Sequence, residues 1–214
     1  MASALSFTKM TSITKLLETG GRHPRVRVYL DGRFAFSLEP ETAARLKLGQ
    51  ELSESEIEDL VKDNEKQRAL ASAYLSLSHR PHSSQEIRQK LARKQFGEET
   101  ISRTLADLTA RGLLNDAEFA RFWRENREAF RPHSRSFVGL ELRHKGVAAE
   151  LAGEATAGMD DAASALRAAE KKAKTLARAD HDTFFRRLGD YLKRRGYNYE
   201  VIQKTIAQLW KTKG

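Results

Sequence analysis

Arg80-Pro81-His82-Ser83 returns unchanged as Arg131-Pro132-His133-Ser134, and this repetition decides the fold. Each copy is followed at the same distance by the end of an apparent helix. These helix ends fall at Gln95, at Gly146 and, in a third copy, at Gly196, in steps of 51 and 50 residues. Self-similarity with a period of about 50 residues is typical of stacked supersecondary units that bury their faces mainly against their neighbours. The sequence therefore predicts a tandem array.

Within the first repeat, the apolar spacing predicts three short helices. Residues 69–77 carry an apolar stripe at helical spacing, and Pro81 ends that helix. Ser83 or Ser84 is expected to cap the next helix. Residues 100–110 supply the third helix, so the unit resembles a helix-turn-helix in its geometry.

The later repeats follow the same plan. In the second repeat we expect Asp116 to cap the first helix and residues 148–157 to form the third. In the third repeat an alanine- and lysine-rich helix is expected from near Ala163, followed by a middle helix over residues 183–195. A last helix, entered at Asn198 or at the tyrosine after it, is expected to close the unit with its terminal tryptophan in the core.

The N-terminal part reads as strands. Apolar residues alternate on both sides of Asp31-Gly32, which predicts a β-hairpin with a type I turn and a bulge at the glycine. That geometry would place Val28 opposite Phe34 and Val26 opposite Phe36. A third strand is expected from residues 13–17, a short helix from residues 41–46, and a capping box from Ser53 with Glu56.

These patterns predict a mainly α protein, an elongated array of three tandem three-helix repeats preceded by a small N-terminal β-hairpin or sheet and short helices. The expected domains are the N-terminal part at residues 1–66 and the three repeats at residues 67–114, 115–160 and 161–214.

Composition excludes several kinds of chemistry. Cysteine is absent from the 214 residues, which removes disulfides, thiolate catalysis and cysteine-based metal sites, and which fits a reducing cytoplasm. No phosphate-binding loop, dinucleotide fingerprint or zinc-protease motif occurs, and the six histidines do not cluster. His82 and His133 are expected to share a structural task, such as bonding a nearby carbonyl. We therefore expect no enzyme activity, no cofactor, no metal and no membrane partner.

Positive charge is concentrated in the repeats. Residues 1–66 have a net charge of −1, whereas residues 67–214 have a net charge of +10. Basic clusters recur at the C-terminal end of each middle helix, where they would either cap the helix dipole or form a stripe at intervals of roughly 20 to 25 Å for an anionic partner. The candidate binding residues are Arg93, Lys94, Arg124, Arg127, Arg131, Arg135, Arg143, Lys145, Lys193, Arg194 and Arg195.

Four segments together resemble the RecX family of recombinase regulators. They are residues 112–120, the Arg-Pro-x-Ser entry to the preceding unit, residues 141–146 and residues 194–202. The resemblance is close over residues 69–214 and looser before them. Gln95 stands where the family usually has glycine, so we expect a less sharply left-handed turn there.

The resemblance implies a cytoplasmic, monomeric regulator of DNA repair, recombination and the SOS response. Its repeats would lie along the groove of a RecA filament on single-stranded DNA, and could also contact duplex DNA through phosphates. This binding would hinder ATP hydrolysis, strand exchange and filament growth. The alternative is a set of independent helix-turn-helix modules that read duplex DNA, although no repeat shows a recognition helix with a distinct Asn, Gln or Arg face.

Overall fold

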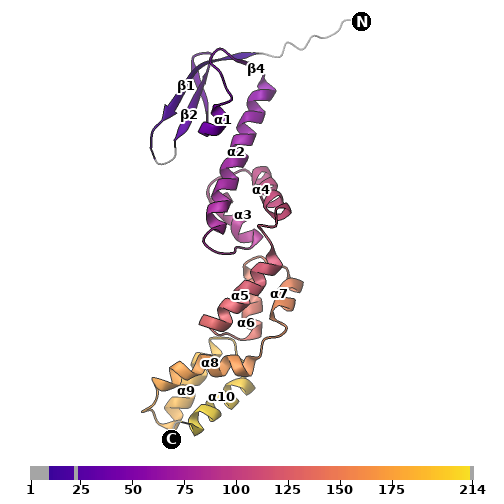
Figure 1. The fold of residues 1–214 in the computed structure, drawn as a ribbon. Helices are drawn as coiled ribbons and strands as arrows, with labels where there is room; N and C mark the ends of the chain where they lie inside the picture. Colours follow the sequence, from indigo (N-terminus) through magenta and orange to yellow (C-terminus); the bar gives the residue numbers. More distant parts are fainter. Residues whose placement is uncertain (1–9, 22–23, 213–214) are drawn as a thin grey trace. The chain divides into compact units, whose positions relative to one another are not determined.

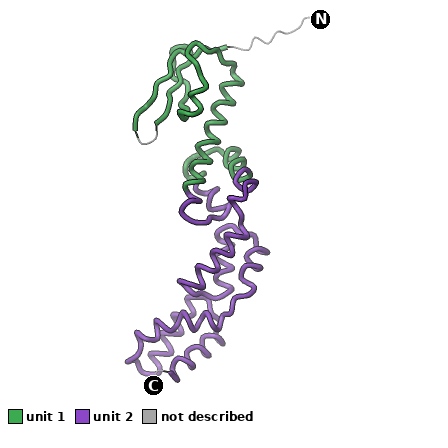
Figure 2. Tube along the Cα trace, viewed as in Figure 1, with its two compact units in different colours: residues 1–75, 91–106 green, residues 76–90, 107–214 purple. Residues whose placement is uncertain are grey.

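The computed structural model describes residues 10–21 and 24–212. It divides into two compact units, one made of residues 1–75 with 91–106 and the other of residues 76–90 with 107–214 (Figure 2). The chain is mainly helical, with a small antiparallel sheet at its N-terminal end and helices throughout the remainder (Figure 1). The predicted fold class is confirmed in these respects.

The sheet has four strands in the order β3-β2-β1-β4, and its strands are β1 (Thr11–Thr19), β2 (Arg25–Leu30), β3 (Arg33–Leu38) and β4 (Glu51–Leu52). The predicted third strand is confirmed as β1. The two-residue β4 was not predicted, because it has too few residues to show an alternating pattern.

The hairpin turn differs from the prediction. Leu30 pairs directly with Arg33, so the loop holds only Asp31 and Gly32. Both loop residues have positive φ, 48° and 79°, as a type I′ turn requires. This turn matches the right-handed twist of its strands, whereas a type I turn would splay them.

The strand register also corrects the prediction. Val28 lies opposite Phe36 rather than Phe34, and Val26 lies opposite Leu38. The extra residue that was expected in the turn is taken up by a register shift beside Val28. Phe34 consequently faces away from the core and is 54% exposed.

Helix α2 (Glu54–Leu77) is one continuous helix where the sequence predicted two. The expected boundary after residue 66 therefore lies inside α2. Its start is the predicted capping box: the Ser53 amide donates to the Glu56 carboxylate at 2.8 Å, and the Glu56 amide donates to the Ser53 hydroxyl at 3.3 Å. A short helix, α1 (Pro40–Ala43), precedes it.

The three repeats contain the remaining helices. Helix α2 continues into the first repeat, and the elements that follow are α3 (Ser84–Arg93), α4 (Glu98–Ala110), α5 (Asp116–Phe130), α6 (Arg135–His144), α7 (Ala149–Thr156), α8 (Asp161–Lys174), α9 (His181–Lys193) and α10 (Tyr199–Lys211). The second repeat, α5 to α7, packs around Phe119 and Leu142. The third, α8 to α10, packs around Phe184 and Leu192, with Trp210 against that core as predicted.

Two predictions about helix ends are wrong. Asn115, not Asp116, caps α5, because its side chain accepts hydrogen bonds from the first-turn amides. The turn at Gln95 is as left-handed as those at Gly146 and Gly196, with φ of 63° against 81° and 83°. The same pair of closing hydrogen bonds follows α3, α6 and α9, so the cap geometry is kept without glycine.

Candidate functional site

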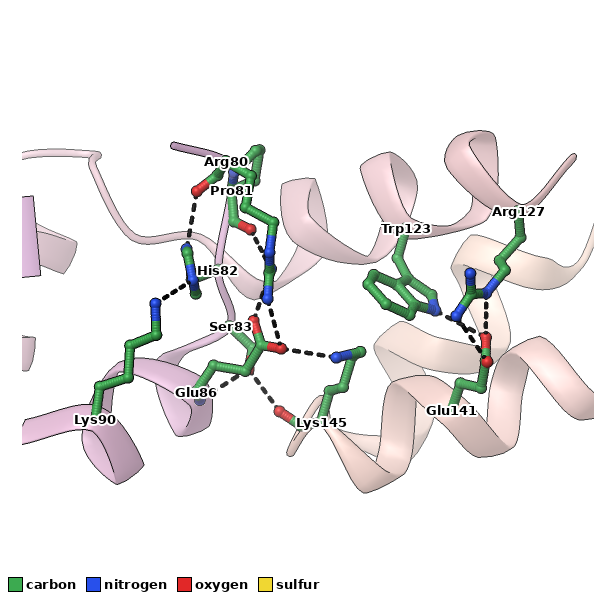
Figure 3. Close-up of polar contacts among 10 residues, drawn as sticks. All are labelled: Arg80, Pro81, His82, Ser83, Glu86, Lys90, Trp123, Arg127, Glu141 and Lys145. Atoms are coloured by element: carbon green, nitrogen blue, oxygen red, sulfur yellow. Dashed lines mark hydrogen bonds and ion pairs between the residues drawn. The ribbon is translucent and has the colours of Figure 1, made fainter. Parts of the chain in front are cut away.

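The repeated Arg-Pro-His-Ser string forms the boundary between consecutive repeats. The hydroxyl of Ser83 donates to the backbone carbonyl of Lys145 at 2.5 Å and accepts from the amide of Glu86 at 3.1 Å (Figure 3). Beside it, the amide of Ser84 donates to the carboxylate of Asp116 at 2.8 Å. The start of α3 is therefore joined to two elements of the second repeat.

The boundary between the second and third repeats has the same construction. The amide of Ser134 donates to the backbone carbonyl of Arg195 at 3.0 Å. The amide of Arg135 donates to the carboxylate of Asp161 at 2.7 Å. In both cases the start of one middle helix meets the end of the next middle helix. We call these two contacts the repeat junctions.

The glycines at the ends of α6 and α9, Gly146 and Gly196, allow the two junctions to form. A Cβ atom built on Gly146 would overlap the side chain of Gln85, and one built on Gly196 would lie 2.7 Å from the Ser134 hydroxyl and 2.8 Å from Cβ of Phe137. Both glycines therefore allow close approach as well as positive φ.

The two histidines of the repeated string bond a carbonyl, as predicted. Nδ1 of His82 donates to the carbonyl of Arg80 at 2.8 Å, and Nδ1 of His133 donates to that of Arg131 at 2.7 Å. Burial lowers the pKa of both imidazoles, although these bonds favour the charged form. Nε2 of His82 is thus the acceptor for Lys90, 2.7 Å away (Figure 3).

An ion cluster reinforces the first junction. Glu86 accepts hydrogen bonds from Arg80 at 2.9 and 3.0 Å and from Lys145 at 2.7 Å (Figure 3). Burial alone would raise the pKa of Glu86, but the bonds and charges of both cations lower it to about 2. The Glu86 side chain is only 14% exposed, so the carboxylate at the centre of this cluster is held largely out of solvent.

A second cluster lies alongside it within the second repeat. Arg127 donates two hydrogen bonds to Glu141, at 2.7 and 2.9 Å, and the indole of Trp123 donates a third at 3.0 Å (Figure 3). Burial would raise the pKa of Glu141, yet these bonds lower it. Arg127 and Lys145 both lie over the Trp123 ring, 4.4 and 4.1 Å from its centroid.

Four of the eleven candidate cations are therefore engaged within the protein. Arg127 and Lys145 belong to the clusters above. Arg124 donates to the carbonyl of Ala155 and pairs with two glutamates of its own helix. Arg195 lies over a tyrosine ring, 3.7 Å from the centroid. All four side chains are only partly exposed, which limits what they can offer a partner.

The other seven candidates differ in their surroundings. All are exposed, and none forms a side-chain ion pair or hydrogen bond with another residue in the described ranges. We call them the outer cations; they are Arg93, Lys94, Arg131, Arg135, Arg143, Lys193 and Arg194. Five of them belong to the second compact unit, where they lie at the start or end of the middle helices or just before them.

Reasoning from the sequence missed the acidic partners. Glu86 and Glu141 were not singled out, and Asp116 was assigned to a cap. The sequence did contain one signal, since Asp116 and Asp161 stand at equivalent positions, each as the first residue of the first helix of its repeat. Equivalence between repeats indicates a shared structural task.

The described part of the chain offers neither a membrane-spanning helix nor a metal site. Within residues 10–21 and 24–212, no helix combines the length and apolarity required to span a membrane. Within the same ranges, no group of three His, Cys, Asp or Glu side chains is arranged to hold a metal ion.

Three related helical units, joined by common junctions between their middle helices, define a tandem helical-repeat protein. Family models match each unit: the first three-helix domain of RecX over residues 69–108, the second over residues 115–155 and the third over residues 160–206. The chain belongs to the RecX family, and the resemblance seen in the sequence is confirmed.

Individual proteins of the family are similar to this chain over most of their length. The regulatory protein RecX of Prosthecochloris aestuarii is 37% identical over 147 residues, which cover 69% of this chain and 97% of the relative. RecX of Clostridium perfringens strain SM101 is 28% identical over 192 residues, 86% of this chain and 90% of the relative. These relatives are named as regulatory proteins.

Solved structures support the same fold. A crystal structure of a regulatory protein RecX matches with a TM-score of 0.56 and 23% identity over 95% of this chain and 94% of that one. RecX from Lactobacillus salivarius matches with a TM-score of 0.58 and 21% identity over 69% of this chain and 97% of that one.

Proposed function

We propose that this chain binds the RecA recombinase filament on single-stranded DNA and inhibits its ATPase activity, strand exchange and filament growth. By doing so it regulates DNA repair and recombination, including the SOS response, as a cytoplasmic monomer without a cofactor. Membership of a family of regulatory proteins supports this proposal.

The observation that carries the proposal is the set of outer cations. Residues 67–214 hold ten more Lys and Arg than Asp and Glu, and the outer cations are the candidates that the protein itself leaves unpaired within the described residues. Phosphates are natural partners for such groups, because binding releases condensed counterions. Since contacts recur from repeat to repeat, each can be weak while linkage raises the effective concentration of the next.

The junctions weigh against independent modules that read duplex DNA with their middle helices. A helix-turn-helix recognition helix contacts base edges with its N-terminal residues. In this chain, the N-terminal residues of α3 and α6 are instead bonded to the following repeat, through Ser83 and Ser134. The first turns of these two middle helices are therefore not available to read bases, and we propose that any contact with duplex DNA is made through its phosphates.

A paired set of charge reversals tests the proposal. The variant carries Arg143→Glu with Arg194→Glu, two outer cations in the second unit. The control carries Lys174→Glu with Arg178→Glu, which are also exposed cations of that unit with no ion pair to a described residue. Recombinase ATPase and strand exchange on single-stranded DNA are titrated with each protein at two salt concentrations.

We expect the variant to need at least about tenfold more protein for half-inhibition, since removing a cation that neutralises a phosphate weakens binding. The control is expected to behave like the unchanged protein, and all three should melt at similar temperatures. Inhibition by the folded variant at unchanged concentration and unchanged salt dependence would remove the outer cations from the proposal.

A further inference from the structure

A polar cleft lies within the first compact unit. It has a volume of about 440 Å³, and its lining comes from β2, β3, α2 and the turn that follows α3. Three of the lining residues are cations, Arg25, Arg68 and Lys94, and one is a carboxylate, Glu65. The cleft is separate from both repeat junctions, whose residues belong to the other unit.

None of the three cations forms an ion pair with a described residue. Nη2 of Arg25 donates to the carbonyl of Ser37 at 2.6 Å, while its buried Nε has no hydrogen-bond partner within the described residues. Arg68 lies over the ring of Phe96, 5.5 Å from the centroid. Two guanidinium groups are thus held in place by neutral groups, which leaves their charge uncompensated.

The carboxylate in the cleft, that of Glu65, is hydrogen-bonded to the start of α4. Glu65 accepts a hydrogen bond from the amide of Gly97 at 3.2 Å and another from the hydroxyl of Thr100 at 3.1 Å. These groups belong to the start of α4, where the helix dipole is positive and favours an anion. Glu65 therefore serves that helix end rather than the cations of the cleft.

We infer that this cleft binds the carboxylate side chains of a short acidic peptide segment in a protein partner. Held guanidinium groups suit planar carboxylates, with which they form paired hydrogen bonds. The cleft is also a local feature, since its unit carries 14 Lys and Arg against 13 Asp and Glu.

The local charge favours a short anion over a polyanion. A nucleic-acid strand binds best along a continuous basic groove. Helix α2, which lines the cleft, instead exposes five acidic residues toward its start, Glu54, Glu56, Glu58, Asp59 and Asp63. A phosphate chain that extended along this helix would meet like charge, whereas a few carboxylates fit within the cleft.

The test uses a fluorescein-labelled hexaglutamate peptide and a labelled oligothymidylate with six phosphates, each titrated with the full chain by fluorescence anisotropy at low salt. The cleft variant carries Arg25→Gln with Arg68→Gln, the two guanidinium groups of the cleft, neither of which is an outer cation. Its control carries Lys62→Gln with Arg103→Gln, two exposed cations of the same unit that pair with glutamates of their own helices. Both variants lose the same formal charge.

We expect the cleft variant to bind hexaglutamate about tenfold more weakly than the control, because the variant can no longer form two charge-assisted hydrogen bonds. Its affinity for oligothymidylate should match that of the control. Equal peptide binding by the two variants would overturn the inference. So would a selective loss of oligothymidylate binding, which would make the cleft a nucleic-acid site. The assay contains no recombinase, so its result is independent of the proposed function.

Discussion

The hydroxyl of Ser83 donates a 2.5 Å hydrogen bond to the backbone carbonyl of Lys145, which lies 62 residues further along the chain. Ser134 makes the matching contact to Arg195 through its amide. The Arg-Pro-His-Ser string, at the start of one middle helix, thus contacts the residues that end the middle helix of the following repeat. The string and the helix end recur with the same spacing because they form the two sides of one contact.

Alanine at the junction glycines is expected to destabilise the protein strongly. Gly146→Ala and Gly196→Ala each place a Cβ against a neighbouring side chain, in addition to straining a residue with positive φ. Left-handed strain alone costs about 1 kcal/mol, and overpacking adds about 1–3 kcal/mol. Urea unfolding monitored by circular dichroism measures the difference.

The matched control is Gly112→Ala. Gly112 has a φ of 69°, but nothing lies within 4 Å of its built Cβ. This variant should show only the strain, about 1 kcal/mol. Equal losses at all three glycines would mean that the close approach at the junctions contributes nothing.

Charge reversal should separate Lys145 from its neighbour Arg143. Lys145→Glu places a carboxylate beside Glu86 and removes the cation over Trp123, so we expect a loss of about 3 kcal/mol or more. Arg143→Glu alters an exposed residue with no ion pair in the described ranges and should change stability by about 0.5 kcal/mol or less. Chemical denaturation at pH 7 compares them; similar stabilities would contradict the engaged role of Lys145.

Acid should weaken the first junction through Glu86. Its pKa is about 2 in the folded protein and near 4.5 otherwise, so its contribution is complete above pH 4.5 and is lost as the pH falls toward 2. The full loss is about 3 kcal/mol. Stability measured against pH for the native chain and for Glu86→Gln should converge over this range, because glutamine does not titrate. Parallel curves would contradict the assignment.

Proton binding by His82 should also oppose folding. Burial lowers the pKa of this imidazole below its ordinary 6.5, so the stabilising neutral form is complete above pH 6.5 and is lost as the pH falls toward the folded pKa. Lys90→Met should raise that pKa, since the ammonium group lies 2.7 Å from Nε2. Imidazole resonances followed by NMR titration measure both values; an unchanged pKa in the variant would exclude Lys90 as a contributor.

Local pattern predicted most of the elements but not their continuity. Alternation identified the hairpin, and helical spacing identified the repeats, because both depend on residues close in sequence. The continuity of α2 was predictable, because residues 54–77 contain no glycine or proline to break a helix. The change in composition near residue 66 suggested a boundary there instead. The position of the β-bulge was not predictable from the sequence, since a bulge in the turn and a bulge beside Val28 both restore the alternation of apolar residues.

The candidate site was only partly readable for a related reason. The helix ends that carry the cations follow from the period of the repeat. Which cations are engaged depends on acids brought in from other elements, such as Glu86 for Lys145 across 59 residues and Glu141 for Arg127. Pairing at that separation leaves no periodic trace in a single sequence.

Asp180 occupies, in the third repeat, the capping position that Ser83 and Ser134 hold in the first two. Its carboxylate accepts from the amide of Thr183 and can only accept at neutral pH. It therefore has no hydrogen to give to a backbone carbonyl, as the Ser83 hydroxyl gives to Lys145. The hydroxyl-to-carbonyl bond of the first junction thus depends on a side chain that donates and accepts at once, and the start of α9 carries one that only accepts.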